Sequence, residues 1–259
     1  MKNKKNVIIG IVCLFTICTM QGEKMAIGFT GANIQNITYP VGGTTGTLKS
    51  ITGWVNITSF VAGAGVIIEQ EGTSLGTDEG FFVYTANTDS TFRFASITSS
   101  GATGTWSTPL TTGRHHFVVT YDAGSVSNDP IIYLDGTSVT VTENVTPTGS
   151  IASGSNSKYL LGDNSAGTGN IAFDGNILSI AIYNRILSTT EITEAYNSKL
   201  AIPTYRGLVF APQLHSRGEV GEGGTLTASH TIADGVSGAL GTPSGSPTYK
   251  GDAVLTYGG

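Results

Sequence analysis

Short runs of alternating apolar and polar residues, separated by Gly, Asn, Asp and Ser, repeat along most of the chain. This period-two alternation is typical of β-strands that bury one face, and the residues between the runs favour turns. The strongest hairpin signal is Asp135-Gly136, because a type I′ turn needs a positive φ at both central residues. It predicts paired strands over residues 131–134 and 137–143. We therefore expect an all-β protein with many short strands.

Residues 50–59 also read as a strand, but the apolar positions in it change phase. Ile51 and Trp54 cannot lie on one face of a regular strand, because side chains alternate between the two faces. A β-bulge at Gly53 explains this change. The sequence thus predicts a bulged strand here, with Trp54 in the core.

One segment carries a helix signal rather than a strand signal. Ser188-Thr-Thr-Glu191 fits a capping box, in which Ser188 is the N-cap and Glu191 is the third helical residue. Leu187, before the cap, is placed to pack on Ile192. We expect one short helix near Ser188–Asn197.

Composition and charge exclude several classes of function. The chain has 259 residues, of which 12% are charged, with a net charge of -5. A nucleic-acid partner would require clusters of Lys and Arg, and none follows the first five residues. Cys13 and Cys18 are the only cysteines, so the rest of the chain can form no disulfide framework and no Cys-based metal or catalytic site.

The first 24 residues have two interpretations. Met1 to Lys5 is basic and residues 7–20 are apolar, which is typical of a secretory signal peptide. The alternative is an untranslated upstream extension, with Met25 as the true start. Either way, residues 1–24 are not expected to belong to the fold or to leave a membrane segment after processing.

Motifs between residues 110 and 197 follow a recognisable order. They are Gly113-Arg-His-His-Phe-Val-Val-Thr-Tyr-Asp122, Tyr133-Leu-Asp-Gly136, Leu160-Leu-Gly-Asp-Asn164 and Phe173-Asp-Gly-Asn-Ile-Leu-Ser-Ile-Ala-Ile-Tyr183, followed by the capping box. This order resembles the laminin-G-like, concanavalin-A-like jelly-roll family. The resemblance implies a two-sheet antiparallel jelly-roll sandwich over residues 25–200.

Glycoside hydrolases of related sandwich folds need paired carboxylates, and no Glu-x-Asp-x-x-Glu run is present. Glu69 and Glu71 alternate onto one face of a strand, but they stand at its end beside Gly72. We interpret them as a solvated strand end. The chain is therefore expected not to be an enzyme.

Five residues are candidates for binding. Asp78-Glu79 and Asp163-Asn164 lie in Gly-rich loops, where oxygen ligands suit Ca²⁺; ordinary turn chemistry also explains them, so calcium is a prediction and no metal site is assigned. Trp106 stands between Gly104 and Pro109, outside the expected strands. It is either an exposed ring that stacks on a sugar or an aromatic plug beneath a loop.

The segment of residues 201–259 is rich in Gly, Ser and Thr and resembles the start of a second unit. Arg206-Gly-Leu-Val-Phe-Ala-Pro212 reads as an opening strand, and residues 255–259 read like residues 27–31. The segment has too few apolar residues to fold alone. It is expected to pair with its own sandwich, to join copies into a homo-oligomer through residues 205–259, or to be disordered.

Two functions follow from these features. The first is a non-catalytic binding module, extracellular, secreted or on a virion surface, that recognises glycans or another surface polymer. The second is a structural subunit of a virion, appendage or fibre that assembles through its C-terminal strand.

Overall fold

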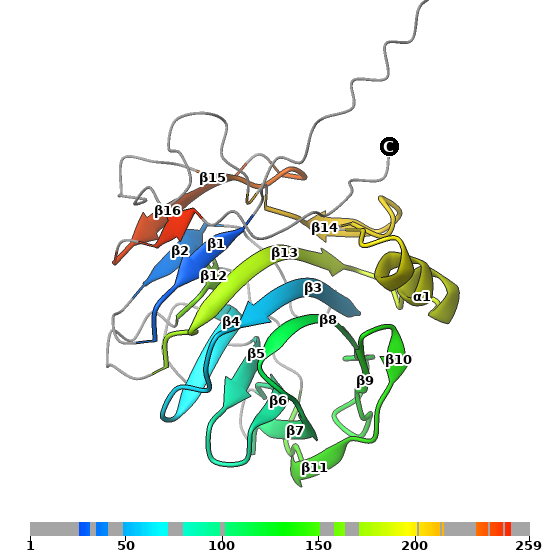
Figure 1. The fold of residues 1–259 in the computed structure, drawn as a ribbon. Helices are drawn as coiled ribbons and strands as arrows, with labels where there is room; N and C mark the ends of the chain where they lie inside the picture. The colour runs from blue at the N-terminus through cyan, green and yellow to red at the C-terminus, as the bar shows by residue number, and fades with distance from the viewer. Residues whose placement is uncertain are drawn as a thin grey trace, which may run out of the picture.

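Two antiparallel β-sheets face each other in the computed structural model (Figure 1), as the sequence predicts. The structure describes residues 26–31, 35–40, 49–71, 80–98, 102–150, 158–163, 171–200, 202–212, 214, 232–237, 239–245 and 247–249. Within these ranges, no helix is both long enough and apolar enough to span a bilayer.

The strands of the two sheets come from all parts of the chain. Across sheet A they are β10 (Thr137–Ser138), β9 (Ile131–Leu134), β8 (Gly113–Thr120), β3 (Ser50–Ile57), β13 (Gly175–Tyr183), β1 (Ile27–Phe29) and β17 (Thr248–Tyr249), and β14 (Leu208–Phe210) also pairs with β13. Across sheet B they are β11 (Thr142–Val145), β7 (Gly104–Pro109), β6 (Thr91–Ser96), β5 (Phe81–Ala86), β4 (Ala64–Glu71), β12 (Lys158–Leu161), β2 (Asn36–Tyr39), β16 (Leu240–Ser244) and β15 (Ile232–Ala233).

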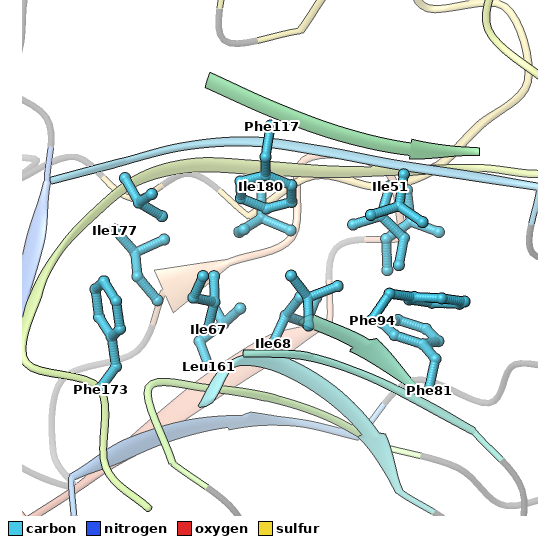
Figure 2. Close-up of a cluster of buried hydrophobic side chains, with 14 of the residues drawn as sticks. Ile51, Ile67, Ile68, Phe81, Phe94, Phe117, Leu161, Phe173, Ile177 and Ile180 are labelled. Carbon is cyan, nitrogen blue, oxygen red and sulfur yellow. The ribbon is translucent and has the colours of Figure 1, made fainter. Parts of the chain in front are cut away.

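The core fills the space between the inner faces of the two sheets (Figure 2). Phe117 and Ile180 point into it from sheet A, and Ile68 and Phe94 point into it from sheet B. All four side chains are almost completely buried. Burying a side chain of this size is worth about 1.5–3 kcal/mol, so this layer is the main source of the fold's stability.

The Asp135-Gly136 turn is confirmed, with φ values of 51° and 79°. The strand predicted to follow it is wrong in extent, because residues 137–143 do not form one strand. β10 pairs with β9 in sheet A, whereas β11 pairs with β7 in sheet B. The chain therefore crosses from one sheet to the other directly after the hairpin.

The predicted bulge at Gly53 is wrong, because β3 pairs with β8 in continuous register from Ser50 to Ile57. The register shift lies across from it in β13, between Ile177 and Ser179. Trp54 simply faces the other side of the sheet. Gly53 faces the core, where an added Cβ would lie 2.8 Å from the ring of Phe117.

Helix α1 (Thr189–Asn197) confirms the predicted helix and covers part of the outer face of sheet A. Ser188 and Glu191 form both hydrogen bonds of the capping box. Leu187 and Ile192 share a buried cluster with residues of the sheet. The helix therefore adds a second apolar layer outside sheet A.

Trp54 also belongs to this outer layer and packs near the C-terminal end of α1. Its ring lies 4.8 Å from that of His116 and 5.8 Å from that of Tyr196, and its Nε1 donates to the carbonyl of Leu200 at 3.0 Å. Burial lowers the pKa of His116 to about 4, so the imidazole is neutral at physiological pH.

The described parts of residues 201–259 pair with this chain's own sheets. β16 pairs with β2 in sheet B, β17 pairs with β1 in sheet A, and β14 pairs with β13. Asp234 joins the hairpin of β15 and β16 to the end of β14. Its buried carboxylate accepts hydrogen bonds from the backbone N–H groups of Ala211, Val236 and Ser237, and from the Ser237 hydroxyl.

We expect Asp234→Ala to lower the free energy of unfolding by about 1–3 kcal/mol, because buried amides lose their acceptor. Urea unfolding measures this loss, and hydrogen exchange should rise at the Ala211 and Ser237 amides. Ser244→Ala, on an exposed side chain of β16, is the control and should behave as wild type. Equal stability of the two variants would show that Asp234 does not hold this segment.

Candidate functional site

The outer face of sheet B is the counterpart of the surface that α1 covers on sheet A. In β5, Phe81 and Val83 point into the core. Phe82 and Tyr84 alternate with them, so they point outward, and both are half-buried. Two aromatic side chains thus stand two residues apart on one strand, about 6.6 Å along it.

Strand register shows which residues flank these two rings. Phe82 lies between Glu69 of β4 and Ala95 of β6, and Tyr84 lies beside Arg93 of β6. Beyond Arg93, the next residue in the row is Ser107 of β7. We call this outer side of sheet B the sheet-B face; in it Phe82, Tyr84 and Arg93 are half-buried, and Ala95 and Ser107 are buried beside them.

Arg93 is fixed in place at the centre of this face. Its guanidinium donates to Asp89 Oδ2 at 2.6 Å and to Thr91 Oγ1 at 3.0 Å, and it interacts with the Tyr84 side chain. The hydrogen bond from Thr91, and then Arg93 itself, lower the pKa of Asp89, which therefore stays ionised. Asp89 and Thr91, at the turn between β5 and β6, therefore fix the position of Arg93 on this face.

A second polar pair extends the same row. Ser107 donates from its hydroxyl to Asn144 Oδ1 at 3.1 Å, and Asn144 Nδ2 lies 3.0 Å from the same hydroxyl. Asn144 belongs to the exposed edge strand β11. Aromatic, cationic, hydroxyl and amide groups therefore follow one another across four strands.

The prediction that Glu69 and Glu71 are a solvated strand end is wrong. They are only 2% and 6% exposed, and β4 lies inside sheet B between β5 and β12. Burial, then the neighbouring Glu71, raises the pKa of Glu69 to about 8, and Asp163 adds to the rise. Lys158 opposes it and forms an ion pair with Glu71 at 3.2 Å.

Of the residues predicted to bind calcium, the structure describes Asp163 alone. It is 3% exposed and lies close enough to Glu69 to affect its pKa. Asp78, Glu79 and Asn164 lie outside the described residues. Within the described part of the chain, no three His, Cys, Asp or Glu side chains gather in a way that could hold a metal ion. Calcium binding therefore stays a prediction.

Trp106 does not lie on the surface, so its proposed stacking on a sugar is wrong. It belongs to β7, where alternation turns it toward the core, and it is 1% exposed. Its ring stacks on Phe94 at 5.9 Å, and its Nε1 donates to Asp129 at 3.0 Å. Trp106 is a core residue with a satisfied N–H group.

Phe82, Tyr84 and Arg93 were not among the residues predicted from the sequence. The signal was the unbroken aromatic and apolar run from Phe81 to Tyr84, in which alternate residues must face opposite sides. The run does not show which of its two faces is open. That depends on what packs against the sheet.

The family model described as the concanavalin A-like lectin/glucanases superfamily matches residues 31–193, so the chain belongs to this superfamily. A comparison with curated proteins found no match. A SAP-like pentraxin from Limulus polyphemus is 14% identical with a TM-score of 0.51, covering 67% of this chain and 82% of that one. A "putative carbohydrate binding protein" from Bacteroides ovatus is 18% identical with a TM-score of 0.55, covering 91% and 62%. These two likenesses show the fold.

We expect Glu69→Gln to stabilise the protein at alkaline pH. The folded-state pKa of Glu69, about 8, lies above the ordinary value of 4.5, so its contribution is complete below pH 4.5 and is lost as pH rises through 8. The loss has a slope of up to about 1.4 kcal/mol per pH unit. Urea unfolding from pH 5 to pH 9 measures it.

The control for this prediction is Glu143→Gln, on an exposed carboxylate of β11. Its stability should follow the wild-type pH profile throughout. A Glu69→Gln profile parallel to that of the wild type would mean that Glu69 is ionised in the fold at neutral pH.

Proposed function

We propose that this protein is a non-catalytic binding module that recognises glycans or another surface polymer through the sheet-B face. The observation that carries the proposal is the pair Phe82 and Tyr84, outward on one strand and beside a fixed polar row. A sugar ring has apolar faces and polar edges, and an aromatic ring beside hydrogen-bonding groups complements both.

The rigidity of this surface supports the proposal. Arg93 is bound on three sides, and Ser107 is bonded to Asn144, so little side-chain freedom is left to lose when a ligand binds. A preorganised surface binds more tightly than a mobile one for the same contacts. The neighbouring sheet supplies the rigid support beneath.

Membership of a superfamily of lectins and glucanases is consistent with binding to carbohydrate. The Bacteroides ovatus neighbour is itself described as a carbohydrate-binding protein. A module of this kind acts on polymers outside the cytoplasm, so we also propose an extracellular, secreted or virion-surface location.

The pairing of β16 and β17 with this chain's own β2 and β1 bears on the structural-subunit alternative. While β16 and β17 pair with β2 and β1 of their own copy, they cannot take the same places in a second copy. The binding module is therefore the function we favour, and homo-oligomerisation through residues 205–259 stays a prediction. Light scattering with and without residues 201–259 tests it.

Glycan-array binding by wild type, Phe82→Ala and Tyr84→Ala tests the proposed function. Each variant should weaken binding by about tenfold, which is the usual cost of losing a central aromatic contact of 1–2 kcal/mol. Tyr205→Ala, which removes an aromatic side chain that is 60% exposed and outside the sheet-B face, is the matched control.

Circular dichroism should show the same fold for all three variants. A wild-type protein that binds no glycan or other surface polymer would refute the proposed function. Equal binding by the three variants would place the ligand elsewhere on the molecule.

A further inference from the structure

Both cations on the outer side of sheet B are held by carboxylates of the same surface. Arg93 pairs with Asp89 at 2.6 Å, and Lys158 pairs with Glu71 at 3.2 Å. In the described strands of sheet B these two are the only Lys or Arg residues. Neither cation therefore meets a ligand as a free charge.

Carboxyl groups outnumber cations around the two aromatic rings. Glu69 lies directly beside Phe82 in the register of β4 and β5, and Glu71 and Asp163 are close enough to Glu69 to act on its charge. Glu69 is neutral at physiological pH and adds no charge of its own. An anionic ligand at Phe82 would still approach Glu71 and Asp163, and like charges repel. It would gain a cation only by breaking one of the two ion pairs.

A ligand that carries hydroxyl groups and no charge meets neither cost. It can stack on Phe82 and Tyr84 and form hydrogen bonds with the exposed Asn144, while both ion pairs remain intact. Since hydrogen bonds between neutral groups are little affected by ionic strength, its affinity should not depend on salt.

We propose that the sheet-B face selects uncharged glycan chains and rejects anionic ones, and that Glu71 and Asp89 set this specificity by holding Lys158 and Arg93. The inference rests on the proposed function, because it specifies the ligand of the same surface. Of these two carboxylates, Glu71 should have the larger effect on specificity. Its side chain is 8% exposed whereas that of Lys158 is 36% exposed, so removing the Glu71 charge releases a cation that a ligand can reach.

The test compares neutral and anionic polymers that share a backbone: hydroxyethylcellulose with carboxymethylcellulose, and galactan with sulfated galactan. Affinity electrophoresis and calorimetry measure Kd at low and high salt. Wild type should bind a neutral polymer with a salt-independent Kd, and its anionic partner about tenfold more weakly or worse.

Glu71→Gln should leave binding of the neutral polymer unchanged. It should strengthen binding of the anionic polymer by about tenfold at low salt, and this gain should vanish at high salt. Asp89→Asn tests the second ion pair through the ratio of anionic to neutral binding, because it also loosens Arg93 within the sheet-B face. The inference therefore does not depend on one variant folding well. Asp122→Asn is the matched control, because it releases Lys49 from an ion pair beside sheet A.

The outcomes separate the two proposals. If wild type prefers the anionic polymers, the specificity inference is wrong and the proposed function stands. If Glu71→Gln and Asp89→Asn change anionic binding no more than Asp122→Asn does, these carboxylates do not set specificity. If no polymer of either charge binds, the proposed function fails and the inference fails with it.

Discussion

The packing of two sheet faces against each other is the interaction on which the rest of this structure depends. Phe117 and Ile180 on one side and Ile68 and Phe94 on the other remove both inner faces from water. Each sheet is left with one outer face. Sheet A covers part of its outer face with α1 and an aromatic cluster around Trp54, whereas sheet B presents aromatic and charged side chains.

The edges of the sheets pose a second problem, because an unpaired strand edge invites association with other chains. β17 and β16 pair with β1 and β2, the first strands of the sandwich, and β14 pairs with β13. Asp234 fixes this arrangement with buried hydrogen bonds to backbone amides. The same segment that reads as the start of another unit thus completes both sheets of this one.

Burial also decides the electrostatics of the sheet-B face. Glu69 has the properties of a neutral acid at physiological pH, because its burial and the neighbouring Glu71 raise its pKa to about 8. Ion pairs hold both cations of the described sheet-B strands, Arg93 and Lys158, against carboxylates. Stability, pH response and ligand charge are therefore linked through one small group of residues.

The sequence by itself determined the features that obey local rules: the strand alternation, the Asp135-Gly136 turn, the capping box at Ser188, and through them the family and the sandwich. The outward positions of Phe82 and Tyr84 were also implicit in the alternation. Only the tertiary structure decided the rest. Whether Trp106 faces the core, whether Glu69 meets water and how far each outer face is covered all depend on what packs against each strand. A period of two marks two faces without saying which is covered.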